Sequence, residues 1–172
     1  TNQNLTVYNR TTDEDGDKIK QIYNWHRNGS SITVLNMPFE RYNTSNTANT
    51  KDYSSRGNNG TYRNGPLWNA TGGYDGRGAY QLDGLNDYIE VPYSTSLVYR
   101  GNGSNLSISF WFYPNTSDAT IDYVISKPWN GGGEYNYWIR YLSNAIDFRL
   151  MGNSTSSITT ASTFPRNSWH HV

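Results

Sequence analysis

The sequence contains no cysteine, which excludes disulfides and thiolate metal sites, so we expect a fold that is held together by its core alone. Its net charge is zero, which leaves no basic field to hold a polyanion and argues against nucleic acid as a partner. No apolar run approaches the roughly 18 residues that a membrane span needs. The first residues also lack the pattern of a signal peptide, which predicts a mature chain or a fragment.

Hydrophobic residues make up only 34% of the chain, but it carries fifteen Tyr and six Trp. Each aromatic side chain buries about 150–250 Å², so a core can be built from few of them, and we favour a folded chain over a disordered one. Much of the remainder is Asn, Ser, Thr and Gly, which suit turns and solvent-facing strand positions. The composition therefore predicts an all-β protein.

Asn-X-Ser/Thr sequons are the most informative motif, because the chain holds ten of them. Its 22 Asn and its share of Ser and Thr would give roughly four or five by chance. We predict an N-glycosylated extracellular protein whose glycans shield loops and strand edges; the alternative is an Asn-rich surface whose sequons are not used. Without disulfides, such a chain fits an archaeal surface layer or appendage better than an animal ectodomain. The predicted glycosylation sites are Asn4, Asn9, Asn28, Asn43, Asn59, Asn69, Asn102, Asn105, Asn115 and Asn153.

Residues 1–30 are predicted to form a domain remnant or a docking extension. Short strands are expected at 4–9 and 19–27, with an acidic turn at 13–17 between them and Asn28-Gly29 closing a second turn. The stretch from Asp13 to Ser30 resembles the end of the immunoglobulin-like repeats of archaeal and bacterial surface proteins. In those repeats a Trp fills the core, and the resemblance assigns this role to Trp25. Two or three strands cannot form such a sandwich alone.

The remaining residues predict a two-sheet sandwich. An apolar strand at 32–40 precedes a long polar loop, 42–78, that Tyr53, Tyr62, Trp68 and Tyr74 could pin to the surface. Residues 106–113 alternate with period two, placing Leu106, Ile108, Phe110 and Phe112 on one face. The other strands are expected at 79–82 and 88–91 around a hairpin-like turn, and at 123–127, 135–142, 145–151, 157–161 and from 169 onward.

The order of motifs from residue 32 onward resembles the laminin G-like, or concanavalin A-like, jelly-roll superfamily. The segments that carry the resemblance are 35–40 (LNMPFE), 51–61 (KDYSSRGNNGT), 78–97 (GAYQLDGLNDYIEVPYSTSL), 106–114 (LSISFWFYP), 124–127 (VISK) and 169–172 (WHHV). We therefore assign residues 31–172 to a laminin G-like β-sandwich. Members usually continue past the last motif for several strands, and we expect these to be truncated or supplied by another subunit.

No catalytic residue is predicted. Sandwich glycosidases of this superfamily carry Glu-x-Asp-x-Glu on one strand, which sets two carboxylates about 5 Å apart, and none of the four Glu of this chain belongs to such a triplet. Asp147 shares a strand face with Arg149, so we expect an ion pair or a solvated surface. Neighbouring residues on a strand point to opposite faces, so His170 and His171 cannot chelate one ion, and we expect one to pack and one to be exposed.

Calcium is a candidate cofactor, since many laminin G-like domains bind it at a rim loop through carboxylates and carbonyls. The candidate ligands are Asp52, Asn58, Asp83, Asn86 and Asp87, although ordinary turn chemistry competes with this hypothesis. Asp13, Asp15 and Asp17 resemble the start of an EF-hand loop. Because Asn24 stands where that loop has its Glu, we predict a turn there.

Two function hypotheses follow. The first is a non-catalytic, glycosylated structural or adhesive protein of a surface layer, filament or stalk, which self-associates or joins neighbouring domains by strand addition, with 4–9 as donor. The alternative is a calcium-assisted module of a larger adhesin that binds carbohydrate or protein. Its candidate ligand-binding residues are Trp129 and Tyr135, which flank a Gly-rich loop where an aromatic ring could stack on a sugar.

Overall fold

The computed structural model describes residues 6–17, 19–41, 49–99, 105–115, 121–128, 135–151, 156–161 and 163–172. The described chain is all-β with antiparallel pairing, as the composition predicts, and its one helical element is a 3₁₀ turn, η1 (Thr95–Leu97). The strands are β1 (His26–Arg27), β2 (Ser30–Ser31), β3 (Asn49–Thr50), β4 (Gly60–Arg63), β5 (Leu67–Asn69), β6 (Ala79–Gln81), β7 (Tyr88–Glu90), β8 (Trp111–Phe112), β9 (Asp122–Pro128), β10 (Tyr135–Leu142), β11 (Ala145–Leu150), β12 (Ser156–Thr159) and β13 (His170–His171).

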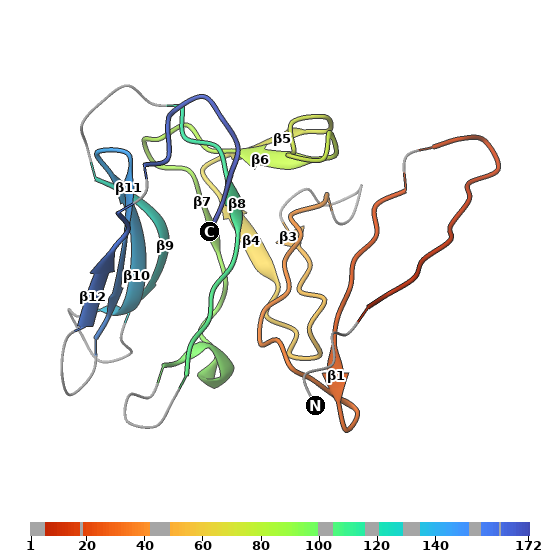
Figure 1. The fold of residues 1–172 in the computed structure, drawn as a ribbon, viewed down its shortest axis with the longest axis horizontal. Coiled ribbons are helices and arrows are strands. Elements are labelled where there is room, and N and C mark those ends of the chain that lie inside the picture. Colours follow the sequence, from red (N-terminus) through yellow and green to blue (C-terminus); the bar gives the residue numbers. More distant parts are fainter. Residues whose placement is uncertain are drawn as a thin grey trace.

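The largest sheet has four strands in the order β12-β11-β10-β9 and forms one layer of the molecule (Figure 1). Its central hairpin, β10–β11, turns through Ser143 and Asn144, both with positive φ (51° and 63°). Two consecutive residues of this kind close a two-residue hairpin whose twist matches that of the flanking strands. The predicted strands at 135–142, 145–151 and 157–161 are thus confirmed to within a few residues.

The core lies between this sheet and the segment that contains β8. Ile139, Tyr141 and Ile146 are buried, and Phe110, Phe112 and Val172 are among the side chains that pack against them. Residues 105–113 alternate between exposed and partly buried positions, with Leu106, Ile108, Phe110 and Phe112 on the partly buried side. β13 pairs with β8, and Phe110 and Val172 extend this ladder by two backbone hydrogen bonds. The predicted alternation and the strand beginning near residue 169 are both confirmed, but of the predicted strand at 106–113 only Trp111–Phe112 forms a strand.

The expected N-terminal strands are mostly wrong. Among the described residues of 4–9, 19–27 and 32–40, only His26–Arg27 forms a strand, paired with β2 across the Asn28-Gly29 turn. Side chains replace the missing ladder, because Asn24 Nδ2 donates to the carbonyl of Tyr53 and Asn36 Nδ2 donates to that of Tyr23. Polar side chains that bond nearby backbone offer it an alternative to a sheet. Trp25 is 37% exposed, so it does not fill a sandwich core.

The region from 42 to 78 is more regular than expected, since β3, β4 and β5 lie within it. The turn at 83–87 does not join a hairpin: β6 pairs with β5, and β7 pairs with β4. Strand propensity predicted β6 and β7 as strands. Their pairing partners are distant in sequence, so the local pattern could not identify which strands they pair with. Three of the four predicted aromatic pins make ring contacts, because Tyr62 and Trp68 pack on Tyr80, and Tyr74 stacks on Trp111 with ring centroids 3.6 Å apart. The fourth, Tyr53, has the Lys51 ammonium over its ring.

Candidate functional site

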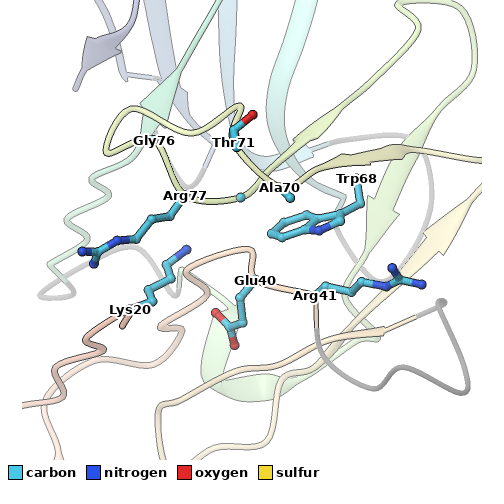
Figure 2. Close-up of a pocket in the computed structure, with 9 residues that line it drawn as sticks. Lys20, Glu40, Arg41, Trp68, Ala70, Thr71, Gly76 and Arg77 are labelled. Atoms are coloured by element: carbon cyan, nitrogen blue, oxygen red, sulfur yellow. The ribbon is translucent and has the colours of Figure 1, made fainter. Parts of the chain in front are cut away.

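A cleft of about 260 Å³ lies between the segment around residues 20–41 and the β5–β6 hairpin (Figure 2). It is lined by Lys20, Glu40, Arg41, Trp68, Ala70, Thr71, Gly76, Arg77 and Gly78. The lining residues lie up to 58 positions apart in the sequence, from Lys20 to Gly78, so only the folded chain brings them together.

The position of the Trp68 indole is fixed by the residues that pack against it. A Cβ on Gly78 would fall within 2.5 Å of three atoms of the indole ring, so glycine is required there for Trp68 to lie where it does. The indole also packs on Tyr80, with the centroids of the two rings 5.0 Å apart. Tyr62 donates a hydrogen bond to the Tyr80 hydroxyl, and burial together with this contact raises the pKa of Tyr62. Tyr62 thus supports the Tyr80 ring, and Tyr80 in turn packs on the indole.

The charged groups of the cleft are mostly cationic. Figure 2 shows the Lys20 ammonium pointing into the cleft, while the guanidinium groups of Arg41 and Arg77 point outward at opposite ends. One of the three Lys20 donors bonds the carbonyl of Pro38 at 2.8 Å, which fixes the side chain and leaves two donors. The carboxylate oxygens of Glu40 are buried and have no hydrogen-bond partner among the described residues. The accessible charge is thus positive.

Sequence reasoning identified Trp68 only as a surface pin and missed the cleft. No local signal marks Lys20, Arg41 or Arg77, since lone basic residues in polar segments are usually solvated. The Gly-rich segment 72–78 was the one hint, because glycines allow close approach of a side chain.

Asp52, a predicted calcium ligand, is instead the centre of a buried hydrogen-bond network. Its exposed fraction is 4%, and Oδ1 accepts from the amides of Asn36 and Ser54 at 2.9 and 2.8 Å. Oδ2 accepts from the Ser54 hydroxyl and the Asn58 amide at 2.7 and 2.8 Å. These four donors occupy all the lone-pair positions of a carboxylate, so its arrangement does not fit a calcium site.

Asn58, the second predicted ligand, extends the same network and is 6% exposed. Its Nδ2 donates to the carbonyl of Val34 at 2.7 Å and lies 3.0 Å from the Ser96 hydroxyl. The network therefore ties the segment before β3 to η1. Burial acts to raise the pKa of Asp52, but the hydrogen bonds from Asn36, Ser54 and Asn58 outweigh it, and the net pKa is lowered.

The other calcium candidates lie in the exposed turn 83–87. Asp83 Oδ1 accepts from the amides of Leu85, Asn86 and Asp87 at 2.9 to 3.2 Å, and these bonds lower the pKa of Asp83. Asp87 in turn accepts from the Asp83 amide. This is turn chemistry of the expected kind, and calcium binding at Asp83, Asn86 and Asp87 stays a prediction.

The acidic turn at 13–17 is present. Asp13 Oδ1 accepts from the amides of Asp15 and Asp17, and all three carboxylates are exposed with ligand atoms within 4.8 Å of one another. The hydrogen bond between the Asp15 and Asp13 side chains contributes most to the lowered pKa of Asp13. The geometry is that of a tight turn around Gly16, whose φ is 82°.

The ion pair of Asp147 involves a different arginine from the one expected. Arg140 Nη2 lies 2.6 Å from Asp147 Oδ2, across the β10–β11 ladder, and this hydrogen bond raises the pKa of Arg140. Arg140 and Arg149 instead flank the indole of Trp138, at 3.8 and 5.4 Å from its centroid. The pair is thus part of a packed sheet face.

The two adjacent histidines behave as predicted. His170 packs against Phe112 and Phe164, and its Nε2 lies 2.6 Å from the carbonyl of Pro165. His171 is exposed and contacts the Ser109 hydroxyl and the Trp111 ring. Their side chains therefore cannot share one metal ion.

Six predicted glycosylation sites lie within the described residues, and all six asparagines are exposed: Asn9, Asn28, Asn59, Asn69, Asn105 and Asn115. Asn28 is the first residue of the β1–β2 turn, where nothing contacts the following glycine from outside. Asn59 and Asn69 accept hydrogen bonds through Oδ1 from the amides of Asp52 and Thr71, which leaves their Nδ2 atoms without a described partner. Asn9 differs from these two, because its Nδ2 donates to the Tyr23 hydroxyl at 3.2 Å. Glycosylation of the six asparagines stays a prediction.

Several predicted residues fall outside the described part of the chain. These are the sequon asparagines Asn4, Asn43, Asn102 and Asn153, and the candidate ligand-binding residue Trp129. The backbone of Tyr135 begins β10, but its side chain is also outside the described set. Ligand binding by Trp129 and Tyr135 stays a prediction.

The layered antiparallel sheets around one aromatic core define a β-sandwich protein. A laminin G family model, described as the concanavalin A-like lectin/glucanases superfamily, matches residues 82–172, more than half of the chain. The chain belongs to this superfamily. No curated protein and no solved structure matches it. The match begins at Leu82, so the immunoglobulin-like character of residues 1–30 and the boundary at residue 31 stay predictions.

Family membership suggests a module that binds carbohydrate or protein, of a kind that is generally non-catalytic and typically extracellular. Among the described residues, no helix has the length and apolar character needed to cross a bilayer.

Proposed function

We propose that this chain is a non-catalytic, N-glycosylated module of an extracellular structural or adhesive protein. The observation that carries the proposal is the exposure of all six described sequon asparagines. Glycans at these positions would be distributed over several segments of the chain, since the six asparagines lie between residue 9 and residue 115. A coat of this kind suits a protein that persists at a surface and resists proteolysis.

The proposal of a non-catalytic role is supported by how three of the described carboxylates are used. Asp52 is saturated by four donors, Asp83 caps a turn, and Asp147 pairs with Arg140. Each is occupied in holding the fold, whereas a general acid or base needs a carboxylate that is free to face a substrate.

We expect the asparagines Asn28 and Asn59, in particular, to carry glycans in protein purified from its native source. Site-specific mass spectrometry of proteolytic peptides measures the occupancy. Ser30→Ala removes the sequon at Asn28 and leaves the turn residues unchanged, so it should abolish modification there and at no other site. Unmodified asparagines at all six positions would overturn the proposal.

Assembly by strand addition is the proposed mode of association. Among the described strands, β13 has one neighbour, β8, so its other edge can receive a strand. Val7 and Tyr8, which belong to the proposed donor segment, are 46% and 93% exposed and lie outside any strand. Apolar side chains this exposed are available for a partner sheet.

Light scattering over a range of protein concentrations tests this association. We expect oligomers that dissociate on dilution, and we expect Val7→Lys with Tyr8→Lys to shift the equilibrium to monomer. As a control, Ile158→Lys places one such charge on an exposed position of β12 and should leave the equilibrium unchanged, and Tyr8→Lys alone is the variant of equal added charge. A well-folded monomer at all concentrations would contradict the proposed assembly.

The second candidate function is a binding module of a larger adhesin, and the cleft beside Trp68 favours it. In such a cleft the aromatic ring can contact one face of a ring-shaped ligand, and the cationic and hydroxyl groups can bond its substituents. Calcium assistance belongs to this hypothesis as an expectation for Asp83, Asn86 and Asp87. Binding measured with and without a chelator separates a calcium-assisted module from one that needs no metal.

A further inference from the structure

We propose that the cleft beside Trp68 binds a single acidic sugar residue, a uronate or a sulfated hexose, of a surface glycan. The inference deepens the second candidate function and rests on it. It combines the cleft, the seated indole and the cationic lining, which are three separate features of the structure.

The size of the cleft limits the ligand. Its volume of about 260 Å³ is just below the roughly 300–1,000 Å³ of sites that enclose drug-sized molecules. One sugar ring fits this space, whereas an extended oligosaccharide would continue beyond it. The cleft therefore recognises one residue of a longer chain, or its end.

The charge of the cleft determines which substituent the bound sugar should carry. Lys20, Arg41 and Arg77 contribute three positive charges, and the only acidic residue of the lining, Glu40, has both carboxylate oxygens buried. A carboxylate or sulfate in the cleft would receive charge-assisted hydrogen bonds from the inward-pointing Lys20 ammonium. Arg41 and Arg77, whose guanidinium groups point outward, would add only a longer-range positive field. Within this set the Lys20 ammonium is the group that points into the cleft, and two of its three donors are not used by Pro38.

The indole explains why a sugar is favoured over a small inorganic anion. Trp68 lines the cleft with an apolar ring that is held by Gly78 and Tyr80. The C–H face of a pyranose buries apolar surface against such a ring, and a free sulfate ion has no apolar face to offer. Thr71, which also lines the cleft, adds a hydroxyl that can bond a sugar hydroxyl.

Isothermal titration of the purified glycoprotein with three probes tests the proposal: methyl glucuronide, methyl glucoside and sodium sulfate. We expect methyl glucuronide to bind at least about tenfold more tightly than either of the others. Methyl glucoside lacks the anionic group, and sulfate lacks the sugar ring. Its affinity should fall as the salt concentration rises, because exposed charges are screened. Equal affinity for glucoside and glucuronide, no glucuronide binding, or sulfate binding as tight as glucuronide would overturn it.

Variants locate the binding to this cleft. Lys20→Gln should weaken glucuronide binding by about tenfold through loss of the inward charge, and Trp68→Ala should abolish it. Trp68→Phe keeps a smaller ring in the same seat and should give intermediate affinity, which separates loss of stacking from loss of folding. Arg56→Gln is the matched control, since Arg56 is exposed and does not line the cleft. Glucuronide binding that is unchanged in Lys20→Gln and Trp68→Phe would contradict the assignment.

The two proposals fail separately. Absence of glycans at the sequons would overturn the glycosylated surface protein and leave the titrations unaffected. Absence of glucuronide binding would remove the acidic-sugar site and leave the glycan map intact.

Discussion

Asp52→Asn is expected to lower the free energy of unfolding by about 3 kcal/mol, because it leaves buried donors without an acceptor. The carboxylate receives four hydrogen bonds, two at each oxygen. An amide replaces one oxygen with an NH₂ group, which faces two of those donors and can accept from neither. Each buried unsatisfied group costs about 1–3 kcal/mol. For a chain of this length the melting temperature should fall by roughly 6–12 °C.

The control for this variant is Asp83→Asn, which makes the same chemical change in an exposed turn. Water replaces the lost acceptor there, so we expect a change of about 0.5 kcal/mol or less. Chemical denaturation followed by tryptophan fluorescence measures both. Equal destabilisation by the two variants would show that the buried network around Asp52 does not hold the segments 34–36 and 54–58 together.

The same network predicts a pH dependence. The pKa of Asp52 is lower in the folded chain than its usual value, so its contribution to stability is complete above the unfolded pKa of about 3.9. That contribution is lost as the pH falls through the folded pKa. Melting temperatures recorded from neutral pH downward should therefore show the difference between the wild type and Asp52→Asn narrowing in acid. A difference that stays constant to the lowest pH would contradict this assignment.

Asn136→Ala is expected to cost about 2–4 kcal/mol, since it removes two buried hydrogen bonds and leaves a small cavity. Asn136 is 1% exposed. Its Oδ1 accepts from the Tyr99 amide at 2.6 Å, and its Nδ2 donates to the Tyr99 carbonyl at 2.7 Å. The side chain thus pairs with both backbone groups of Tyr99 as a neighbouring strand would. Without it, the segment after η1 loses its attachment to β10.

Hydrogen exchange distinguishes this effect from a general loss of stability. The Tyr99 amide should lose its protection in Asn136→Ala, while the amides of the β10–β11 ladder should exchange more slowly than Tyr99. Asn86→Ala serves as the control, because Asn86 is exposed and its hydrogen bonds to the described residues use only its backbone, whose amide donates to Asp83 and whose carbonyl accepts from Asn64. Protection of Tyr99 that survives the substitution at Asn136 would contradict the role proposed for this side chain.

Local patterns predicted the parts of the fold that depend on neighbours in sequence. The alternation at 106–113 and the paired segments 135–142 and 145–151 appear in the structure, because each strand carries its own apolar face. The Asn28-Gly29 turn was also predicted, since both residues accept positive φ.

The segment from 32 to 58 shows why the remainder could not be predicted in the same way. Its apolar residues suggested a strand, but Val34 and Leu35 are each 38% exposed while the polar Asp52 and Asn58 are buried. Hydrogen bonds from distant residues decide this arrangement, and hydrophobic pattern carries no information about them. Ten sequons were visible in the sequence, but whether an asparagine is exposed depends on the folded surface.

The sequence alone determined that the chain is a cysteine-free, aromatic-rich β protein, because composition and period-two alternation act residue by residue. Tertiary structure decided which strands pair, where the carboxylate of Asp52 is buried and how Lys20, Trp68 and Arg77 come to line one cleft. The physical reason is that burial and charge complementarity are properties of groups brought together in space. Segments tens of residues apart acquire them only when the chain is folded.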